Sequence, residues 1–182
     1  FNKNENAGYA KTGFTINLNY GYQFHKNAGA TANLFFNNYN ADQLVLIPAN
    51  GGEEGPSQPV SLQLDHWKLW GLVAGPMLTF DISENIKSDL RLMGGIVNAN
   101  SPRAVIVGQP IAKEDWRMSG VFRGGLDLRI NTGGNVFVFT NADYMYTKPK
   151  FKIEFGSGVE DVFTRKQKMS AINVTGGVGV KF

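Results

Sequence analysis

The sequence ends in Thr175-Gly176-Gly177-Val178-Gly179-Val180-Lys181-Phe182. In this stretch the apolar residues Val178, Val180 and Phe182 alternate with small or polar residues. Successive side chains of a β-strand point to opposite faces, so this alternation is typical of a strand with one apolar and one polar face. The end of the chain therefore predicts an amphipathic β-strand.

The same alternation recurs along the chain and is clearest between Thr12 and Phe24. The apolar parity of that stretch consists of Phe14, Ile16, Leu18, Tyr20, Tyr22 and Phe24. Repeated alternation of this kind indicates half-buried strands. The predicted strands cover residues 12–24, 30–37, 60–80, 87–96, 116–130, 136–146 and 168–182. Within the third, Pro76 cannot donate a ladder hydrogen bond and predicts a β-bulge.

The connections between these strands alternate between short turns and long polar loops. Short turns are predicted at residues 25–27, 81–85 and 131–135, and long loops at 40–59 and 98–115. The sixth strand is extended by residues 151–155, which we expect to pair with 159–163 across Gly156-Ser157-Gly158 as a protruding ribbon. The pattern predicts an antiparallel meander with short turns at one end and long connections at the other.

Composition excludes several classes of protein. Hydrophobic residues make up 42% of the chain, and no run approaches the roughly 18 to 20 apolar residues that a membrane-spanning helix needs. The absence of cysteine excludes disulfides and thiol catalysis. A net charge of +3, without a Lys/Arg cluster of the kind that nucleic-acid binding requires, argues against nucleic-acid binding.

The polar parity indicates which face of the sheet is enclosed. It is rich in small and amide residues such as Asn17, Asn19 and Gly21, which suit a narrow lumen better than a water-exposed surface. Aromatic residues gather at both ends of the apolar parity: Tyr20, Tyr22, Phe24, Phe80 and Phe182 at the turn ends, and Trp70, Trp116, Tyr144 and Tyr146 at the loop ends. We therefore expect residues 1–182 to form a single domain, a transmembrane antiparallel up-and-down β-barrel. The alternative is a soluble up-and-down barrel such as a lipocalin, with the apolar parity inside.

The carboxyl end carries a motif. Thr175, Gly177, Val180 and Phe182 occupy the positions of the assembly signal of bacterial outer-membrane β-barrels, and the chain resembles the small outer-membrane β-barrel proteins of Gram-negative bacteria of the OmpX and OmpA transmembrane-domain type. The resemblance implies eight strands, insertion by the barrel assembly machinery, residence in the bacterial outer membrane, and contact with outer-membrane lipid and lipopolysaccharide. It also implies short turns in the periplasm.

The number of strands evident in the sequence is one fewer than the eight that the resemblance implies. Seven strands are evident in the sequence, whereas bacterial single-chain barrels have an even number. We expect an ascending strand before Phe1, with residues 1–10 as the first outer loop. Alternatively, those residues contribute a poor strand.

Six charged residues share the polar parity of the fourth, fifth and sixth strands. They are Asp89, Arg91, Arg123, Asp127, Arg129 and Asp143. In a barrel of about eight strands their side chains converge inside, because such a lumen is only wide enough for side chains to fill it. We expect a salt-bridged structural plug. The functional alternative is an ion path or gate.

Other candidate residues carry weaker signals. His66, with Asp65 and Ser61, has the residue types of a lipid-modifying enzyme, but the spacing predicts a solvated histidine at the rim; His25 lies in a predicted turn. The acidic pairs Glu53-Glu54 and Glu160-Asp161 suit a divalent cation bridge to lipopolysaccharide phosphates, although acidic loop pairs are usually solvated. We predict no catalytic residue, cofactor or metal site.

The sequence thus predicts a non-enzymatic outer-membrane β-barrel that acts as a structural or interaction component. Its outer loops would carry recognition, for example as an accessory subunit of a larger complex with other outer-membrane proteins. The alternatives are a narrow, porin-like channel and a lipid A modifying enzyme.

Overall fold

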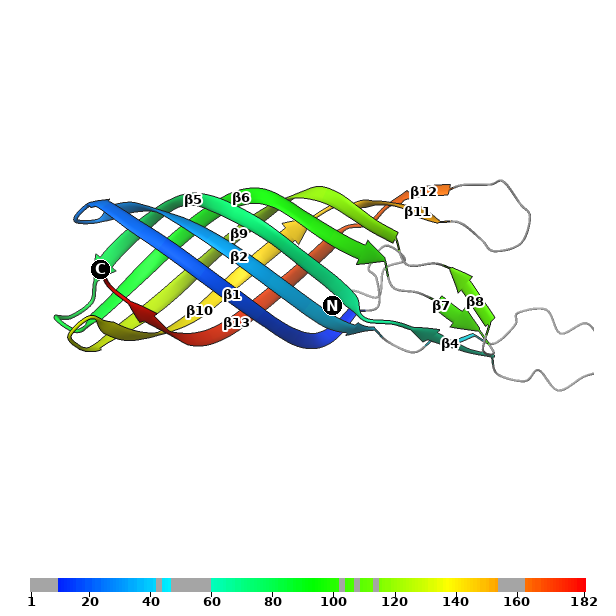
Figure 1. Ribbon diagram of the computed structural model, residues 1–182, viewed down its shortest axis with the longest axis horizontal. Helices are drawn as coiled ribbons and strands as arrows, with labels where there is room; N and C mark the ends of the chain where they lie inside the picture. The colour runs from blue at the N-terminus through cyan, green and yellow to red at the C-terminus, as the bar shows by residue number, and fades with distance from the viewer. Residues whose placement is uncertain are drawn as a thin grey trace, which may run out of the picture.

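The computed structural model describes the backbone of residues 10–41, 44–46, 60–101, 104–106, 109–112, 115–153 and 163–182. Its main sheet contains seven long antiparallel strands, and Figure 1 shows them curling around a common axis. They are β1 (Ala10–His25), β2 (Ala28–Ala41), β5 (Trp67–Asp81), β6 (Ile86–Ser101), β9 (Asp115–Gly133), β10 (Val136–Thr147) and β13 (Met169–Val180). Within the described residues no helix is long and apolar enough to cross a membrane.

The main sheet is a meander, in the order β1-β2-β5-β6-β9-β10-β13. Each long strand pairs antiparallel with the next long strand of the chain. The three short turns lie where the sequence predicts them, and the turn between β9 and β10 needs glycine because Gly133 and Gly134 have φ angles of 104° and 62°. The predicted all-β, up-and-down barrel is therefore confirmed as the fold.

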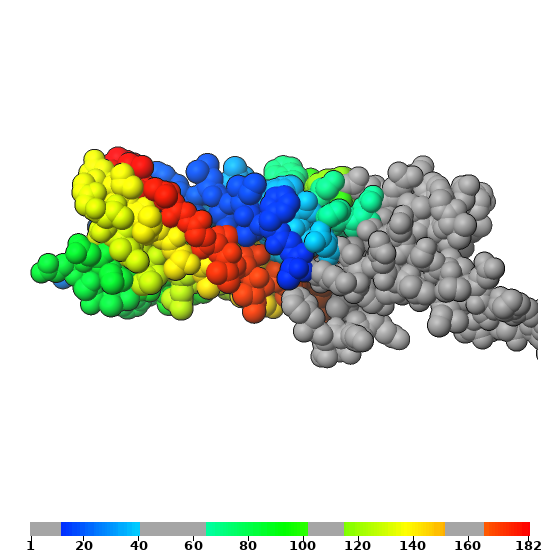
Figure 2. All heavy atoms as spheres, turned by 90° about the horizontal axis from the view of Figure 1, so that it is seen from below, coloured from blue at the N-terminus to red at the C-terminus, as the bar shows by residue number. Residues whose placement is uncertain are grey.

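The barrel is nearly closed, with a seam between β1 and β13. Figure 2 shows these two strands side by side, and the Tyr20 and Phe182 rings stack across the seam at 6.1 Å. The described main sheet has seven strands, so β1 and β13 run in the same direction; within the described residues no ladder joins these two strands. The eighth strand stays a prediction.

Short strands continue the barrel at one end. In the described residues β3 (Leu44–Leu46), β4 (Val60–Leu64), β7 (Ala104–Ile106) and β8 (Gln109–Ala112) form a second sheet, and β11 (Lys150–Ile153) pairs with β12 (Phe163–Lys166). The predicted loops 40–59 and 98–115 were thus wrong in part, because both contain strands. The predicted ribbon was also wrong in register: Ile153 pairs with Phe163, and its turn lies outside the described residues.

Two strand predictions need further correction. Residues 60–80 form two strands in different sheets, β4 and β5, separated at Asp65 and His66. Pro76 causes no bulge: the register with β2 is continuous, and the ladder to β6 skips Gly75 and Pro76 without a shift. Because the β5–β6 ladder is interrupted at Gly75 and Pro76, the backbone N–H that proline lacks is not needed there. No extra residue is therefore inserted into the strand. The last strand also ends at Val180 rather than Phe182.

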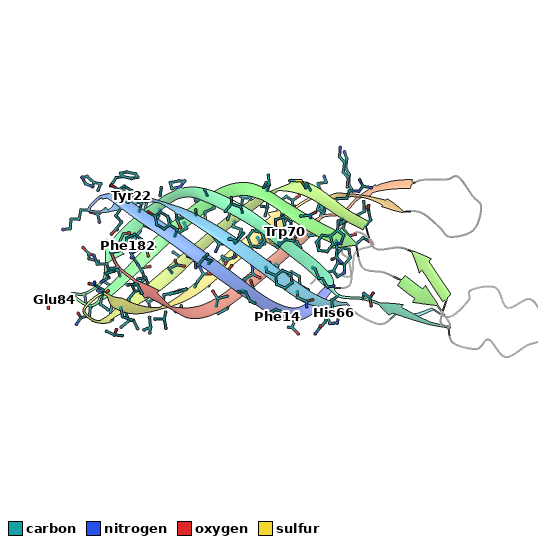
Figure 3. The ribbon with its side chains drawn as sticks, viewed as in Figure 1. Phe14, Tyr22, His66, Trp70, Glu84 and Phe182 are labelled. Atoms are coloured by element: carbon teal, nitrogen blue, oxygen red, sulfur yellow. The ribbon has the colours of Figure 1, made fainter. Side chains whose placement is uncertain are left out.

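The main sheet is apolar outside and largely polar inside. Outward residues are strongly exposed, such as Leu18 at 70% and Phe122 at 48%, whereas inward Arg123 is 1% exposed. Figure 3 shows Phe14, Tyr22 and Trp70 on the outside of the strands. The predicted orientation of the two parities is confirmed.

An apolar plug fills the lumen toward the end that carries the short strands. It consists of Phe35, Trp67, Leu69, Val73, Met93, Val97, Ala99, Val121, Met145 and Phe151. The Trp67 and Phe151 rings meet at 5.9 Å. The sequence analysis predicted an inward parity rich in small, amide and charged residues and did not predict this apolar cluster.

The close approach of β5 and β6 gives a first prediction. A Cβ atom at Gly95 would lie 2.1 Å from the Leu72 carbonyl oxygen, whereas one at the neighbouring Gly94 would meet nothing within 4 Å. We expect Gly95→Ala to lower the free energy of unfolding by about 1–3 kcal/mol, and Gly94→Ala to change it by less than about 0.5 kcal/mol. Denaturant titration of both variants checks this; equal stabilities would contradict the strand geometry.

Candidate functional site

The six charged residues singled out in the sequence lie together in the lumen. Asp89 and Arg91 come from β6, Asp143 comes from β10, and Arg123, Asp127 and Arg129 come from β9. They form three Arg–Asp ion pairs: Arg123–Asp143, Arg91–Asp127 and Arg129–Asp89. Together these pairs, which we call the lumen charge network, have no net charge.

The register of the strands sets these pairings. Asp89 stands directly opposite Asp127 in the β6–β9 ladder, which places like charges side by side. Each aspartate is neutralised by an arginine two residues further along the facing strand: Arg129 pairs with Asp89, and Arg91 pairs with Asp127. Arg123 and Asp143 are also diagonal neighbours, on β9 and β10, but here the arginine lies two residues before Gly125, the residue opposite Asp143. All three ion pairs are thus diagonal cross-strand pairs.

The Arg123–Asp143 pair is the most enclosed. The Arg123 guanidinium donates two parallel hydrogen bonds to the Asp143 carboxylate, of 3.0 and 2.6 Å, and the two side chains are 2% and 0% exposed. Asn33 accepts a third hydrogen bond at 2.5 Å, and the guanidinium lies 4.7 Å from the centre of the Phe35 ring. Bidentate geometry and additional partners offset the cost of burying these charges.

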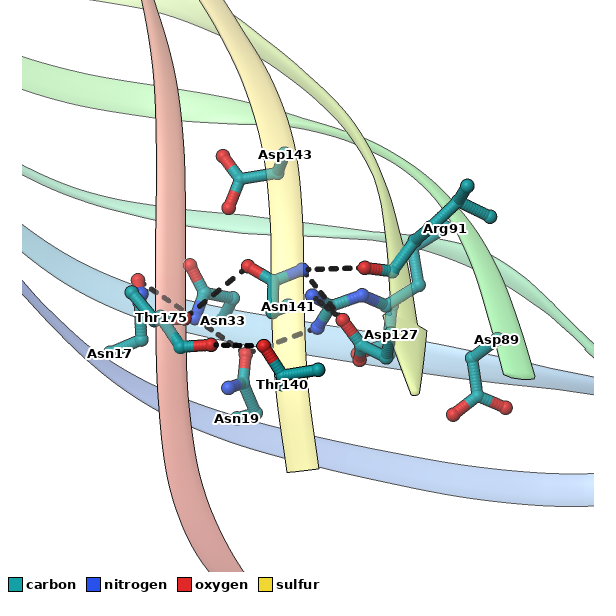
Figure 4. A network of polar contacts seen from close by, with 12 residues as sticks. Asn17, Asn19, Asn33, Asp89, Arg91, Asp127, Thr140, Asn141, Asp143 and Thr175 are labelled. Atoms are coloured by element: carbon teal, nitrogen blue, oxygen red, sulfur yellow. Dashed lines mark hydrogen bonds and ion pairs between the residues drawn. The ribbon is translucent and has the colours of Figure 1, made fainter. Parts of the chain in front are cut away.

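The other two pairs are linked to amides and hydroxyls of neighbouring strands. Arg91 donates to Asp127 at 2.5 Å, and Asn141 donates to the same carboxylate at 2.6 Å (Figure 4). Arg129 donates to Asp89 at 2.7 Å, and the Thr79 hydroxyl donates to that carboxylate at 2.6 Å. Each carboxylate of the network therefore has at least two donors.

Space for this network comes from a glycine. Gly125 has lumen parity and stands opposite Asp143. A Cβ atom at Gly125 would lie 2.6 Å from the Asp143 Cβ. The missing side chain makes room for Asp143, and the sequence alone did not single out this role.

A layer of neutral polar residues connects the charges to the apolar plug, and sequence reasoning missed its role. The Tyr39 hydroxyl donates to Asn173 at 2.9 Å, and Asn173 donates to Asp143 at 3.0 Å. Asn37 donates to Tyr39 at 2.9 Å. Tyr39 and Asn37 have the inward parity of β2, but the hydrogen bonds continue to Asn173 on β13 and from there to Asp143 on β10, so only the curled sheet reveals these contacts.

The residues of the carboxyl-terminal motif divide between the two faces. Thr175 points inward and donates to Asn141 at 3.4 Å, and a Cβ at Gly177 would lie 2.8 Å from the Phe139 ring. Val180 and Phe182 are exposed on the outside, at 62% and 98%. The two inward residues thus shape the lumen, while the two apolar residues remain outside.

The remaining candidates do not assemble into a site in the described part of the chain. His25, Asp65 and His66 are exposed, and the Ser61 side chain, Glu53-Glu54 and Glu160-Asp161 lie outside the side chains that the structure describes. Among the described residues, no group of three or more His, Cys, Asp or Glu side chains could hold a metal ion.

The chemistry of the lumen is that of a closed polar network. Its charges are paired and its carboxylates are already hydrogen-bonded, so the arrangement is suited to fixing strand register and filling the lumen.

No protein-family model, curated protein or solved structure matches the chain.

Proposed function

We propose that this chain is a transmembrane β-barrel of the outer membrane of Gram-negative bacteria, of the small OmpX and OmpA transmembrane-domain type. The inside-out distribution of residues carries this proposal: Ile172, Val174 and Val178 on β13 are 75%, 71% and 69% exposed, while Arg123 and Asp143 are buried. A water-soluble protein rarely exposes a continuous apolar surface of this extent. Lipid would cover it, and the carboxyl-terminal motif supports insertion by the barrel assembly machinery.

The barrel would act without catalysis, as a structural or interaction component. The short strands supply the surface for recognition: in the described residues, β3 and β8 are the outer strands of their sheet, and each pairs on one side only. Such edges can accept a strand of another protein. An accessory subunit of a larger outer-membrane complex is the form of this function that we favour.

The lumen contents argue against the alternative of a channel. Arg123, Phe35, Leu69, Met93 and Met145 are among the largest fully buried side chains, and all point into the barrel. We expect no single-channel conductance from the reconstituted protein in planar bilayers. Ohmic conductance that is lost in Arg123→Gln would instead support a channel.

The enzyme alternative depends on His66, which is exposed and has no described hydrogen-bond partner to orient it. A general base needs a nucleophile within hydrogen-bond reach. We therefore expect cells carrying His66→Ala to retain the lipid A acyl pattern of cells with the unaltered protein.

Two measurements test the proposed function. Unboiled protein should migrate differently from boiled protein on a denaturing gel, as a detergent-resistant barrel does. A variant in which short turns replace residues 44–64 and 104–112, and so remove β3, β4, β7 and β8, should keep this heat-dependent shift but lose the partner that co-purifies with the unaltered chain in mild detergent. A chain that purifies alone, or a variant that keeps its partner, would contradict the interaction role.

A further inference from the structure

Four lysines form a ladder where β10 and β13 pass into the ribbon β11–β12. Lys150 stands opposite Lys166, and Thr147 stands opposite Met169. The register is the same on both sides of the interruption, and the Gln167 amide donates to the Pro149 carbonyl at 2.9 Å between them. Lys148 therefore stands opposite Lys168. We call Lys148, Lys150, Lys166 and Lys168 the lysine ladder.

The lysine ladder points away from the barrel axis. All four lysines are exposed, whereas Pro149 and Phe151, of the opposite parity, are buried. Lys148 and Lys150 have the same strand parity as Tyr144 and Tyr146, which are 48% and 37% exposed on the outside of β10. The ladder thus continues the outward face of the barrel directly beyond a pair of tyrosines, in the direction of the short strands (Figure 1).

These charges are not neutralised by the side chains that the structure describes. None of the four lysines takes part in a described ion pair. On the neighbouring strand β9 the outward residues at this height are Trp116, Met118 and Gly120, which carry no charge. Like charges directly opposite each other in a sheet are destabilising, so two successive Lys–Lys pairs favour a bound anion.

We propose that the lysine ladder binds the phosphate groups of lipids in the outer leaflet of the membrane. This rests on the proposed transmembrane function, which puts Tyr144 and Tyr146 at the membrane–water interface and the ladder at the height of the headgroups. Lysine stems extend along apolar surface while their ammonium groups reach phosphate. Ladder partners are about 5 Å apart at Cβ, so two pairs can surround one or two phosphates. The phosphorylated headgroup of lipid A has the matching charge.

Native mass spectrometry of the full chain in detergent tests the ladder, with bisphosphorylated lipid A as the probe. The test variant replaces all four lysines by glutamine. A matched control replaces four other lysines, Lys26, Lys68, Lys87 and Lys181, and so removes the same charge elsewhere. A second variant replaces the ladder by four arginines, which keeps the charge. The heat-dependent gel shift reports that each variant is folded.

We expect the glutamine variant to bind lipid A at least about tenfold more weakly than the unaltered chain. The control should stay within about twofold, because the effect requires clustered charge. The arginine variant should keep its affinity, and dephosphorylated lipid A should bind poorly. Equal affinity of the glutamine variant and the unaltered chain would overturn the proposal.

Further outcomes distinguish a failure of the lysine-ladder proposal from a failure of the proposed membrane function. If millimolar inorganic phosphate displaces lipid A completely, the ladder binds free anions and the lipid assignment is overturned. If the unaltered chain shows no heat-dependent gel shift, the proposed membrane function fails. If the unaltered chain shows the gel shift but binds phosphorylated and dephosphorylated lipid A equally, only the proposal for the lysine ladder is contradicted.

Discussion

Arg123→Ala is expected to lower the free energy of unfolding by about 3–5 kcal/mol, because it leaves the Asp143 carboxylate buried without its cation. Asp143 is 3% exposed and lies at the junction of the charge network and the neutral polar layer. The substitution also removes the donor to Asn33 and the cation over the Phe35 ring. Urea titration of the folded barrel in detergent measures the loss.

Two variants control this result. Arg117→Ala breaks an ion pair with Asp115 whose side chains are 36% and 21% exposed, and it should cost about 1 kcal/mol or less. Arg123→Met combined with Asp143→Leu removes both buried charges and should cost less than Arg123→Ala alone. If Arg123→Ala proves no more damaging than Arg117→Ala, the lumen network does not hold the barrel together.

An arginine placed on the outside of the barrel should be costly in the middle of a strand and tolerated at its end. Leu126 lies near the middle of β9 and is 55% exposed. We expect Leu126→Arg to destabilise the barrel in lipid vesicles by about 2–4 kcal/mol, because the new charge would lie near the bilayer midplane.

Val136 supplies the matched control, since it is the first residue of β10 and is 42% exposed on the same outward face. Val136→Arg should cost no more than about 1 kcal/mol, because the end of the strand lies at the interface. If the outward face met water, both substitutions would be neutral within about 0.5 kcal/mol. Equal, small effects would therefore contradict a lipid-facing surface.

The long strands could be predicted from the sequence because their two faces differ in chemistry. Phe14 to Phe24 on β1 is apolar at every second residue, and the structure places these side chains outside. On β5 both parities are apolar: Trp67, Leu69 and Val73 point inward, and Trp70 and Leu72 point outward. Period-2 alternation disappears where a strand is apolar on both faces, so the start of β5 and the apolar plug were not predicted.

Other errors arise from features that have little local signal. Strands β3 and β7 each contain 3 residues, too few for a periodic pattern, and lie among glycines and prolines that indicate loops. Parity alone predicts that charges share the lumen, but it does not say which arginine meets which aspartate. Asp89 faces Asp127 in the ladder and is neutralised diagonally by Arg129, so the pairing depends on strand register.

The most direct test of a lipid-facing exterior uses two tryptophans that lie close together on β5 and point in opposite directions. Trp67 is 5% exposed inside the barrel, and Trp70 is 50% exposed outside it. In vesicles of lipids brominated on their acyl chains, a variant that retains only Trp70 should show strongly quenched fluorescence. A variant that retains only Trp67 should keep its fluorescence. Quenching of Trp67 with Trp70 unaffected would contradict the account.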